Sequence, residues 1–139
     1  KTVTEDCVHK AYDVFEGITA YVQRIMHDVF TETATGGTAD VNLVDNMIDR
    51  FIEESSRRIR EQLSVITEQQ KELLYAIHSE GVAKGLTASA FVKRHRLKSA
   101  SSVQSATKQL LEMDLITKEG NEYTLSDPLL KLWLTREIQ

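Results

Sequence analysis

The chain has 139 residues, of which 41% are hydrophobic and 27% charged, a balance typical of a folded soluble protein and not of a disordered one. The formal net charge of −4 argues against overall electrostatic binding of nucleic acid, and the single cysteine, Cys7, excludes an internal disulfide and a cysteine-based zinc site. No apolar run approaches the roughly 18 residues of a membrane span, and no signal peptide is visible, so we expect a cytoplasmic protein with no membrane partner.

Three amphipathic helices are predicted in the first half, because apolar residues recur there at the i, i+3, i+4, i+7 spacing of one helix face. The first ends at Gly17, and the stretch over 33–40 is predicted to be a loop. The third helix runs without Pro or Gly from Val41 to Leu63, and we expect a fully helical unit with Phe51 deeply buried. The apolar positions of the first two helices are Val8, Ala11, Tyr12 and Phe15, then Val22, Ile25, Met26, Val29 and Phe30.

Capping residues divide the second half into further elements. Thr67 with Gln70 three residues later predicts a capping box at the start of a helix that ends at Gly81. Thr87 is predicted to cap a short helix over 88–95, and Ser99 is predicted to cap the next, over 100–113. Strand-forming residues over 115–117 and 123–125 flank a turn and predict a hairpin, after which Asp127 and Pro128 predict a last helix.

This order of three helices, a two-stranded wing and a helix is that of a winged-helix domain. The predicted fold class is therefore mainly α, with a three-helix bundle over residues 1–66 and a winged-helix domain with a small two-stranded wing over residues 67–139. The two parts differ in charge. The first carries 7 Lys and Arg against 12 Asp and Glu, and the second carries 10 against 9, so we expect them to have different roles.

No pattern in the sequence predicts catalysis. Neither GxxxxGK[ST] nor GxGxxG is present, and the paired glycines Gly36 and Gly37 lie between predicted helices with no strand before them. None of the four histidines forms an HxxxH pair, and Cys7 and His9, two residues apart on a helix, point in different directions. We therefore expect that this chain is not an enzyme and that it holds no cofactor and no metal.

The predicted helix over 100–113 is the best candidate for contacting a partner. The small and amide side chains on its polar face can reach base edges or phosphates, and the basic run before it can neutralise a few phosphates. The same face carries one cation, which is equally typical of a solvated helix or of a protein-contact surface. The candidate residues for DNA or partner contact are Lys93, Arg94, Arg96, Lys98, Ser101, Gln104, Ser105 and Lys108.

Several stretches of the chain carry a family resemblance. "VFEGITAYVQRIMHDVF", "LSVITEQQKELLYAIHSEG", "HRLKSASSVQSATKQLLEMDLIT" and "YTLSDPLLKLWL" resemble, in order, the helical lid and the C-terminal winged helix of a family of P-loop ATPases. This family occurs widely in archaea and Bacteroides-like bacteria and is related to AAA+ and STAND ATPases. Within "GITAYVQ", Gly17, Tyr21 and Gln23 match the lid motif G-x-P-x-Y-x-Q, whose glycine-proline turn lies near the nucleotide base, and Thr19 stands in the place of the proline.

The resemblance implies that residues 1–66 are a lid, with Gly17, Tyr21 and Gln23 as candidate cofactor-binding residues. It implies that the P-loop, the Walker B acid, ATP and Mg²⁺ belong to an upstream ATPase domain of the same polypeptide. The first residue is not Met, which agrees with a C-terminal fragment of such a protein.

The function expected on this basis is a non-catalytic relay of nucleotide state to a partner through the winged helix. The alternative is a stand-alone winged-helix DNA-binding transcriptional regulator, whose acidic helical half serves dimerisation or effector binding. A third reading is a structural interaction domain with no role in nucleic-acid binding.

Overall fold

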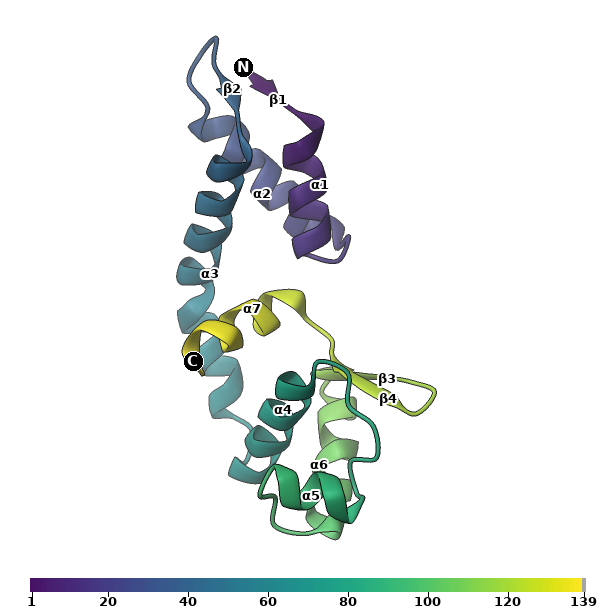
Figure 1. Ribbon diagram of the computed structural model, residues 1–139. Coiled ribbons are helices and arrows are strands. Elements are labelled where there is room, and N and C mark those ends of the chain that lie inside the picture. Colours follow the sequence, from purple (N-terminus) through teal and green to yellow (C-terminus); the bar gives the residue numbers. More distant parts are fainter. Residues whose placement is uncertain (139) are drawn as a thin grey trace. The chain divides into compact units, whose positions relative to one another are not determined.

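The structure, a computed structural model, describes residues 1–138 and divides into two compact units (Figure 1). The first unit is Lys1–Arg57 and the second is Arg58–Gln139. The division falls inside the long helix α3 (Val41–Ser64), whereas the sequence analysis placed the boundary between residues 66 and 67. Gln139, the last residue of the predicted winged-helix domain, lies outside the described residues. The predicted fold class, mainly α with a small two-stranded wing, is confirmed.

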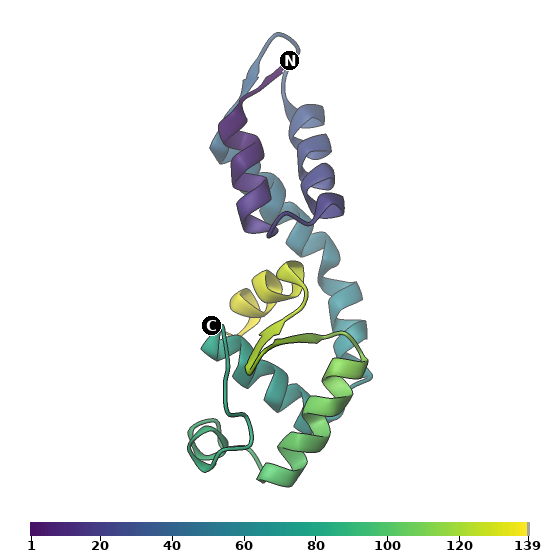
Figure 2. The same cartoon turned by 90° about the vertical axis from the view of Figure 1, so that its right-hand side faces the viewer.

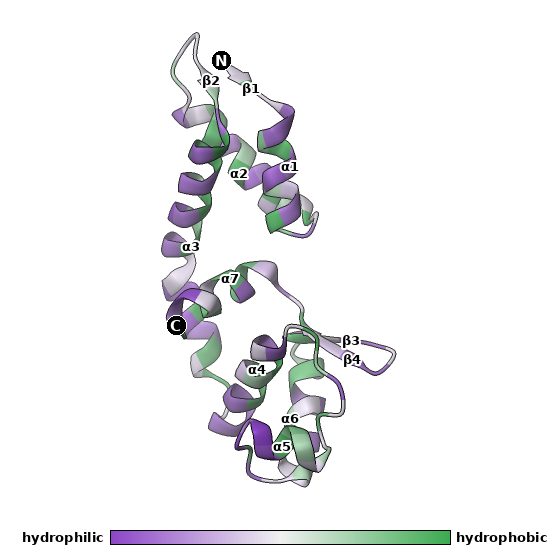
Figure 3. Cartoon of the chain, viewed as in Figure 1, coloured by the Kyte–Doolittle hydropathy of each residue, from purple (hydrophilic) through white to green (hydrophobic). Residues whose placement is uncertain are grey.

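The core of the first unit lies between α1 (Glu5–Val14), α2 (Thr19–Glu32) and the first part of α3. Figure 3 shows the hydrophobic residues of α3 along the side that faces α2. Phe15, Tyr21 and Phe51 meet there with ring centroids 5.3, 5.8 and 5.9 Å apart. Phe51 is 7% exposed, so the prediction that it is buried is confirmed.

A short parallel sheet also belongs to the first unit, and the prediction that this half is fully helical is therefore wrong. β1 (Thr2–Val3) pairs with β2 (Thr38–Ala39) in the loop between α2 and α3. Two-residue strands have no periodicity of their own. Their pairing joins segments far apart in the sequence, so a local pattern cannot predict it.

Three residues of the predicted apolar stripes are exposed. Val8 is 41% exposed, Tyr12 is 56% exposed and Phe30 is 51% exposed. The buried face of α1 runs instead through Cys7 and Ala11, which are fully buried. A three-helix bundle buries a narrower strip of each helix than the predicted stripe covers, so residues at the edge of that stripe face solvent.

The second unit has the elements of a winged helix. They are α4 (Glu68–Glu80), α5 (Ser89–Arg94), α6 (Ala100–Glu112), β3 (Ile116–Glu119), β4 (Glu122–Leu125) and α7 (Pro128–Glu137). The predicted capping box of Thr67 and Gln70 is confirmed, as is the helix end at Gly81, whose φ of 75° suits glycine. The Asp127 carboxylate accepts from the Leu129 N–H at 2.9 Å, which confirms the predicted start of α7.

The start of α5 differs from the prediction. Ala88 is the capping residue and makes no side-chain capping hydrogen bond, whereas Thr87 was predicted to take this role. The backbone N–H of Ala88 instead donates to the Gly85 carbonyl at 3.0 Å. Because of this turn the helix begins at Ser89 and not at Ala88, and the Thr87 side chain does not cap it.

The wing is an antiparallel hairpin extended by one bridge. β3 pairs with β4 so that Lys118 lies opposite Tyr123, and Tyr123 also exchanges two backbone hydrogen bonds with Ala83, at 2.9 and 2.8 Å. Ala83 lies between α4 and α5, so the bridge joins the start of the domain to its wing. Figure 2 shows the hairpin next to the C-terminal end of α6.

Leucines from several helices fill the core of the second unit. Those that are at most 1% exposed are Leu73, Leu74, Leu110, Leu129, Leu130 and Leu134. They come from α4, α6 and α7, so these three helices share one core and hold the wing beside them. Within residues 1–138, no helix combines the length and the apolar character that crossing a bilayer requires.

Candidate site between the recognition helix and the wing

Helix α6, the recognition helix of the winged-helix arrangement, is firmly held against α4. Its buried residues are Val103, Ala106 and Leu110. The Gln70 side-chain amide donates to the Gln109 Oε1 at 2.9 Å, and the Ser99 hydroxyl caps the helix by accepting from the Ser102 N–H at 3.1 Å. The opposite face of α6 is therefore presented to solvent in a fixed orientation.

All four predicted contact residues on α6 are exposed: Ser101, Gln104, Ser105 and Lys108. The Ser101 hydroxyl lies 3.2 Å from the Ser99 hydroxyl, at the capped end of the helix. Gln104 is the one of these four that lines a pocket against the wing. The structure thus places the four residues on one face and brings only Gln104 into a concave site.

The basic run precedes α6 on α5 and in the turn between the two helices. Lys93, Arg96 and Lys98 are exposed. An Arg94 guanidinium nitrogen lies 2.7 Å from the Glu80 carboxylate, and the His95 Nε2 lies 2.7 Å from the same oxygen. These contacts, first the hydrogen bond with His95 and then that with Arg94, lower the pKa of Glu80. One of the four cations is thus already paired with a carboxylate.

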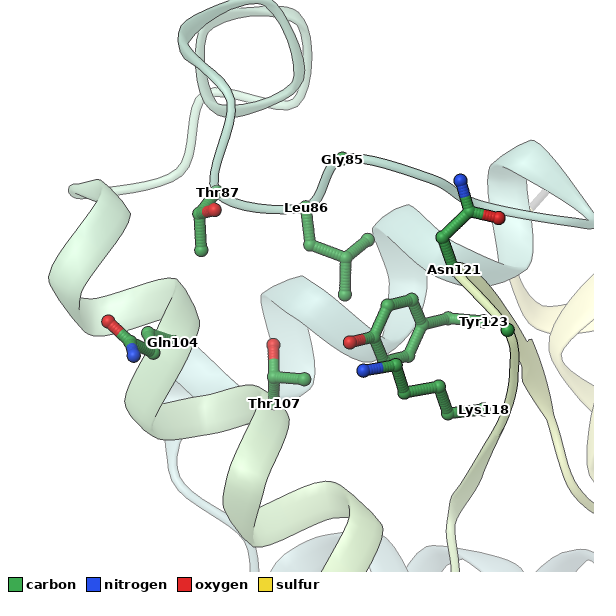
Figure 4. A pocket seen from close by; sticks show the side chains of 9 residues that line it. Gly85, Leu86, Thr87, Gln104, Thr107, Lys118, Asn121 and Tyr123 are labelled. Atoms are coloured by element: carbon green, nitrogen blue, oxygen red, sulfur yellow. The ribbon is translucent and has the colours of Figure 1, made fainter.

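A pocket of about 280 Å³ lies between α6, the wing and the segment that leads into α5 (Figure 4). Its lining combines side chains from all three parts: Gly85, Leu86, Thr87, Gln104, Thr107, Lys118, Gly120, Asn121 and Tyr123. Figure 4 shows Lys118 and Tyr123 extending from the wing toward Thr107 on α6, with Leu86 above them. Of the residues that the structure describes, one cation lines the pocket and no carboxylate does.

The register of the hairpin explains why Lys118 and Tyr123 act together. They are directly opposite one another in β3 and β4, so their side chains project from the same face of the wing. The Lys118 Nζ lies 5.6 Å from the centroid of the Tyr123 ring, a distance at which the ring attracts the ammonium group. The bridge to Ala83 fixes the backbone of Tyr123, and therefore the wall of the pocket.

The polar groups in this pocket differ in what they can still bind. The Thr107 hydroxyl donates its proton to the Val103 carbonyl at 2.7 Å, so only its oxygen lone pairs remain to accept from a ligand. The Lys118 ammonium forms no hydrogen bond or ion pair with residues 1–138, and the side-chain polar groups of Thr87, Gln104, Asn121 and Tyr123 also lack hydrogen-bond partners there. The pocket therefore offers free donors and free acceptors side by side.

The surface around the pocket is electrically neutral. The segment over 83–87, helix α6 and the wing together carry three cations, Lys84, Lys108 and Lys118, and three acids, Glu112, Glu119 and Glu122. Lys84 and Glu122 lie 3.4 Å apart and pair with each other. A polyanion needs an excess of cations along its path, and this face does not provide one.

The lid-motif residues take different places in the first unit. Gly17 has a φ of 73°, and a Cβ there would lie 2.8 Å from the Tyr12 ring, so the position requires glycine. The Tyr21 ring packs in the aromatic cluster with Phe15 and Phe51, while Gln23 is exposed on α2. Gly17 and Tyr21 thus have structural roles, and Gln23 is the member of the motif whose side chain is presented to solvent.

Most pocket residues escaped the sequence analysis. Thr107 and Lys118 were not considered, Tyr123 was placed in a strand of the predicted hairpin, and Thr87 was predicted to cap a helix. The register of the predicted hairpin could have revealed two of them, because a two-residue turn at Gly120 and Asn121 places Lys118 opposite Tyr123.

Among the described residues no group of three His, Cys, Asp or Glu side chains is placed to hold a metal ion.

Comparisons with known proteins agree with this geometry. A family model described as "probable winged helix domain" matches residues 58–136, and a search of curated proteins gives no match. Among solved structures, a Walker-type ATPase of Pyrococcus abyssi is similar, with a TM-score of 0.70 and 15% identity over 95% of this chain and 36% of that chain. The chain thus spans much less than that protein's length, and the likeness concerns the fold. Because the family model matches more than half of the chain, the protein belongs to the family of probable winged helix domains.

Proposed function

We propose that this chain is the lid and winged-helix part of a P-loop ATPase of the AAA+/STAND type, acting in the cytoplasm. In this role it catalyses nothing itself. It passes the nucleotide-dependent movement of an ATPase domain on the same polypeptide to a partner through the winged helix.

One observation carries this proposal. The fold of a Walker-type ATPase is similar over 95% of this chain, which includes the helical first unit as well as the winged helix. Winged helices occur in proteins of many functions, so the second unit alone would favour no particular activity. The combination with this helical unit is far more restrictive, and the lid-motif match at Gly17, Tyr21 and Gln23 lies in that unit.

The proposal assigns ATP and Mg²⁺ to the ATPase domain. The residues of this chain do not suit a triphosphate, because no GxxxxGK[ST] loop follows a strand and the paired glycines Gly36 and Gly37 lie between α2 and β2. Of the lid motif, Gln23 is the exposed residue, and it is the side chain we assign to contact with the nucleotide or with the domain that holds it.

The complete reading frame tests the assignment to an ATPase. We expect a GxxxxGK[ST] sequence after a strand pattern upstream of Lys1, and a frame that encodes only a winged-helix regulator would contradict it. In parallel, purified chain with Mg²⁺ and ATP should release phosphate only at the background rate. Turnover that survives further purification would show that this chain is itself catalytic.

The relay needs its own test in the full-length polypeptide. Gln23→Ala should change the rate of ATP hydrolysis, whereas the exposed Gln69→Ala on α4 should leave it unchanged. Deletion of the winged helix should leave hydrolysis measurable and abolish the response of the partner. If the partner responds equally without the winged helix, the relay is wrong even where the ATPase assignment holds.

The alternative of a DNA-binding regulator has one observation in its favour, the exposed cations Lys93, Arg96 and Lys98 near the start of α6. The neutral surface of α6 and the wing counts against it, because sequence readers usually add Arg or Lys on the recognition helix itself. We therefore rank it second.

A further inference from the structure

The pocket between α6 and the wing has a composition that selects among ligands. Its described lining contains one cation, Lys118, and no carboxylate, so a negatively charged group is the ligand it attracts. The ammonium group has no anionic partner among the described residues and lies beside the Tyr123 ring, on the wall formed by the hairpin. The charge is therefore available for binding at the lining of the pocket.

The neutral surroundings limit how much negative charge the ligand carries. Lys84, Lys108 and Lys118 are balanced by Glu112, Glu119 and Glu122 over the whole face. Nucleic acid carries many phosphates, and this face has no net positive charge with which to neutralise them. A single isolated anionic group meets Lys118 without that repulsion.

The hydrogen-bonding groups distinguish a carboxylate on a peptide from a phosphate. The Thr107 hydroxyl can only accept, since its proton is already donated to the Val103 carbonyl, and the Gln104 and Asn121 amides each offer an acceptor as well as donors. A phosphodiester has no proton to donate to these acceptors. A peptide segment has backbone N–H groups beside its side chains and satisfies both kinds of group.

The volume of the pocket suits the side chain of a single residue. At about 280 Å³ it lies just below the range of roughly 300–1,000 Å³ that holds drug-sized molecules. It opens between a helix and a hairpin, so an extended segment can cross it and insert one side chain. Leu86 supplies an apolar wall against which the methylene groups of that side chain can pack.

We propose that this pocket binds an Asp or Glu side chain of an extended segment of a protein partner. The carboxylate accepts hydrogen bonds from the Lys118 ammonium and the Tyr123 hydroxyl, and a backbone N–H of the segment donates to the Thr107 hydroxyl. This assignment deepens the proposed function, because it names the chemistry by which the winged helix contacts the partner of the relay.

The test is a titration of the ¹⁵N-labelled chain with N-acetyl-aspartate N-methylamide, followed by NMR. We expect saturable shifts of the amide resonances of Thr107, Lys118 and Tyr123, with a dissociation constant of about 1–10 mM for so small a probe. The asparagine analogue, which has the same shape without the charge, should bind about tenfold more weakly. Equal binding of both analogues would show that the pocket does not recognise the negative charge of a carboxylate, which contradicts the proposal.

Matched variants test whether the Lys118 ammonium binds the carboxylate of the probe. Lys118→Gln should weaken the aspartate probe about tenfold, and Lys71→Gln, the same change on α4 outside the pocket, should leave it unchanged. Tyr123→Phe should weaken it about threefold, because it removes one neutral hydroxyl donor and keeps the ring. Equal effects of the two lysine changes would contradict a specific site, provided that both variants retain dispersed spectra.

Other probes separate this proposal from its competitors. Inorganic phosphate that shifts the same resonances at lower concentration than the aspartate probe would overturn it, as would the absence of shifts at these residues. DNA binding that is weakened by Lys118→Gln and not by Arg94→Glu/Arg96→Glu would also overturn it, because the pocket would then be a phosphate site. None of these outcomes depends on ATP. If the probe does not bind, the winged helix can still act in the relay through a different contact surface. If no phosphate loop is found upstream, the pocket can still bind a carboxylate.

Discussion

An ion-pair cluster in the first unit and the pocket in the second use their charged side chains in opposite ways. In the first unit Arg24 binds Asp28 at 2.9 Å and Glu54 at 2.6 Å, while Arg50 binds Glu32 at 3.0 Å. The hydrogen bond to Asp28 is the largest cause of the raised pKa of Arg24. In the second unit the pocket beside α6 leaves Lys118 without an ionic partner among residues 1–138. Paired charges join two helices, whereas an unpaired charge in a concave site is available to a ligand.

The largest effect on stability is expected from a change in the aromatic core of the first unit. Phe51→Ala removes the ring that contacts both Phe15 and Tyr21, and it should lower the free energy of unfolding by about 3–5 kcal/mol. Denaturant unfolding followed by circular dichroism measures this loss. Phe30→Ala, at a ring that is 51% exposed and contacts the Lys1 ammonium, serves as the control and should lower it by only about 1 kcal/mol. A loss below about 1 kcal/mol for Phe51→Ala would show that the aromatic cluster is not a core.

The ion pairs of the first unit should stabilise it moderately. Asp28 is 9% exposed, and Asp28→Ala leaves Arg24 and Arg50 without their shared carboxylate, so we expect a loss of about 1–2 kcal/mol. Lys118→Gln in the pocket should change the free energy of unfolding by about 0.5 kcal/mol or less, since the lysine pairs with no acid among residues 1–138. Denaturant titration of both variants decides this. Similar losses would remove the distinction between the ion-pair cluster and the pocket.

A smaller effect should appear in the pH dependence of the second unit. Burial, and secondarily Lys131, lowers the pKa of His78 from its ordinary value of 6.5, so the unfolded chain takes up a proton more readily than the folded one. The second unit should therefore lose stability as the pH falls below about 6.5, and His78→Gln should flatten this dependence. The single tryptophan, Trp133, is buried in this unit and reports its unfolding by fluorescence.

The exposed His27 supplies the control for this measurement. His27→Gln changes a histidine of the first unit and should leave the pH dependence of the Trp133 signal as it is in the parent chain. If His78→Gln and His27→Gln give the same profile, the burial of His78 does not affect stability.

The smallest expected effect is on DNA binding. The cations Lys93, Arg94, Arg96, Lys98 and Lys108 can neutralise a few phosphates, so the chain should bind random duplex with a dissociation constant of about 10⁻⁴–10⁻⁶ M or weaker, and binding should fall steeply with salt. Titration at two salt concentrations measures this, with Arg94→Glu/Arg96→Glu as the control that removes binding. Nanomolar affinity at physiological salt would favour the regulator over the relay.

Local chemistry in the sequence was sufficient to predict most elements of the fold. The capping box at Thr67 and Gln70, the N-cap at Asp127 and the uninterrupted helix from Val41 depend on residues a few positions apart, so their interactions can be inferred without knowing the rest of the fold. The same holds for the winged-helix order of elements and for the exposure of Ser101, Gln104, Ser105 and Lys108 on α6.

Tertiary structure alone decided the features that join distant residues. The β1–β2 pair connects Thr2 with Thr38, and two-residue strands leave no periodic pattern to predict it. The exposure of Tyr12 depends on how much of α1 its neighbouring helices cover. The pocket requires Thr107, Lys118 and Thr87 to meet from three separate segments, because the bridge between Ala83 and Tyr123 brings the wing toward the start of the domain. Sequence patterns report interactions within one element, whereas a binding site arises where several elements pack together.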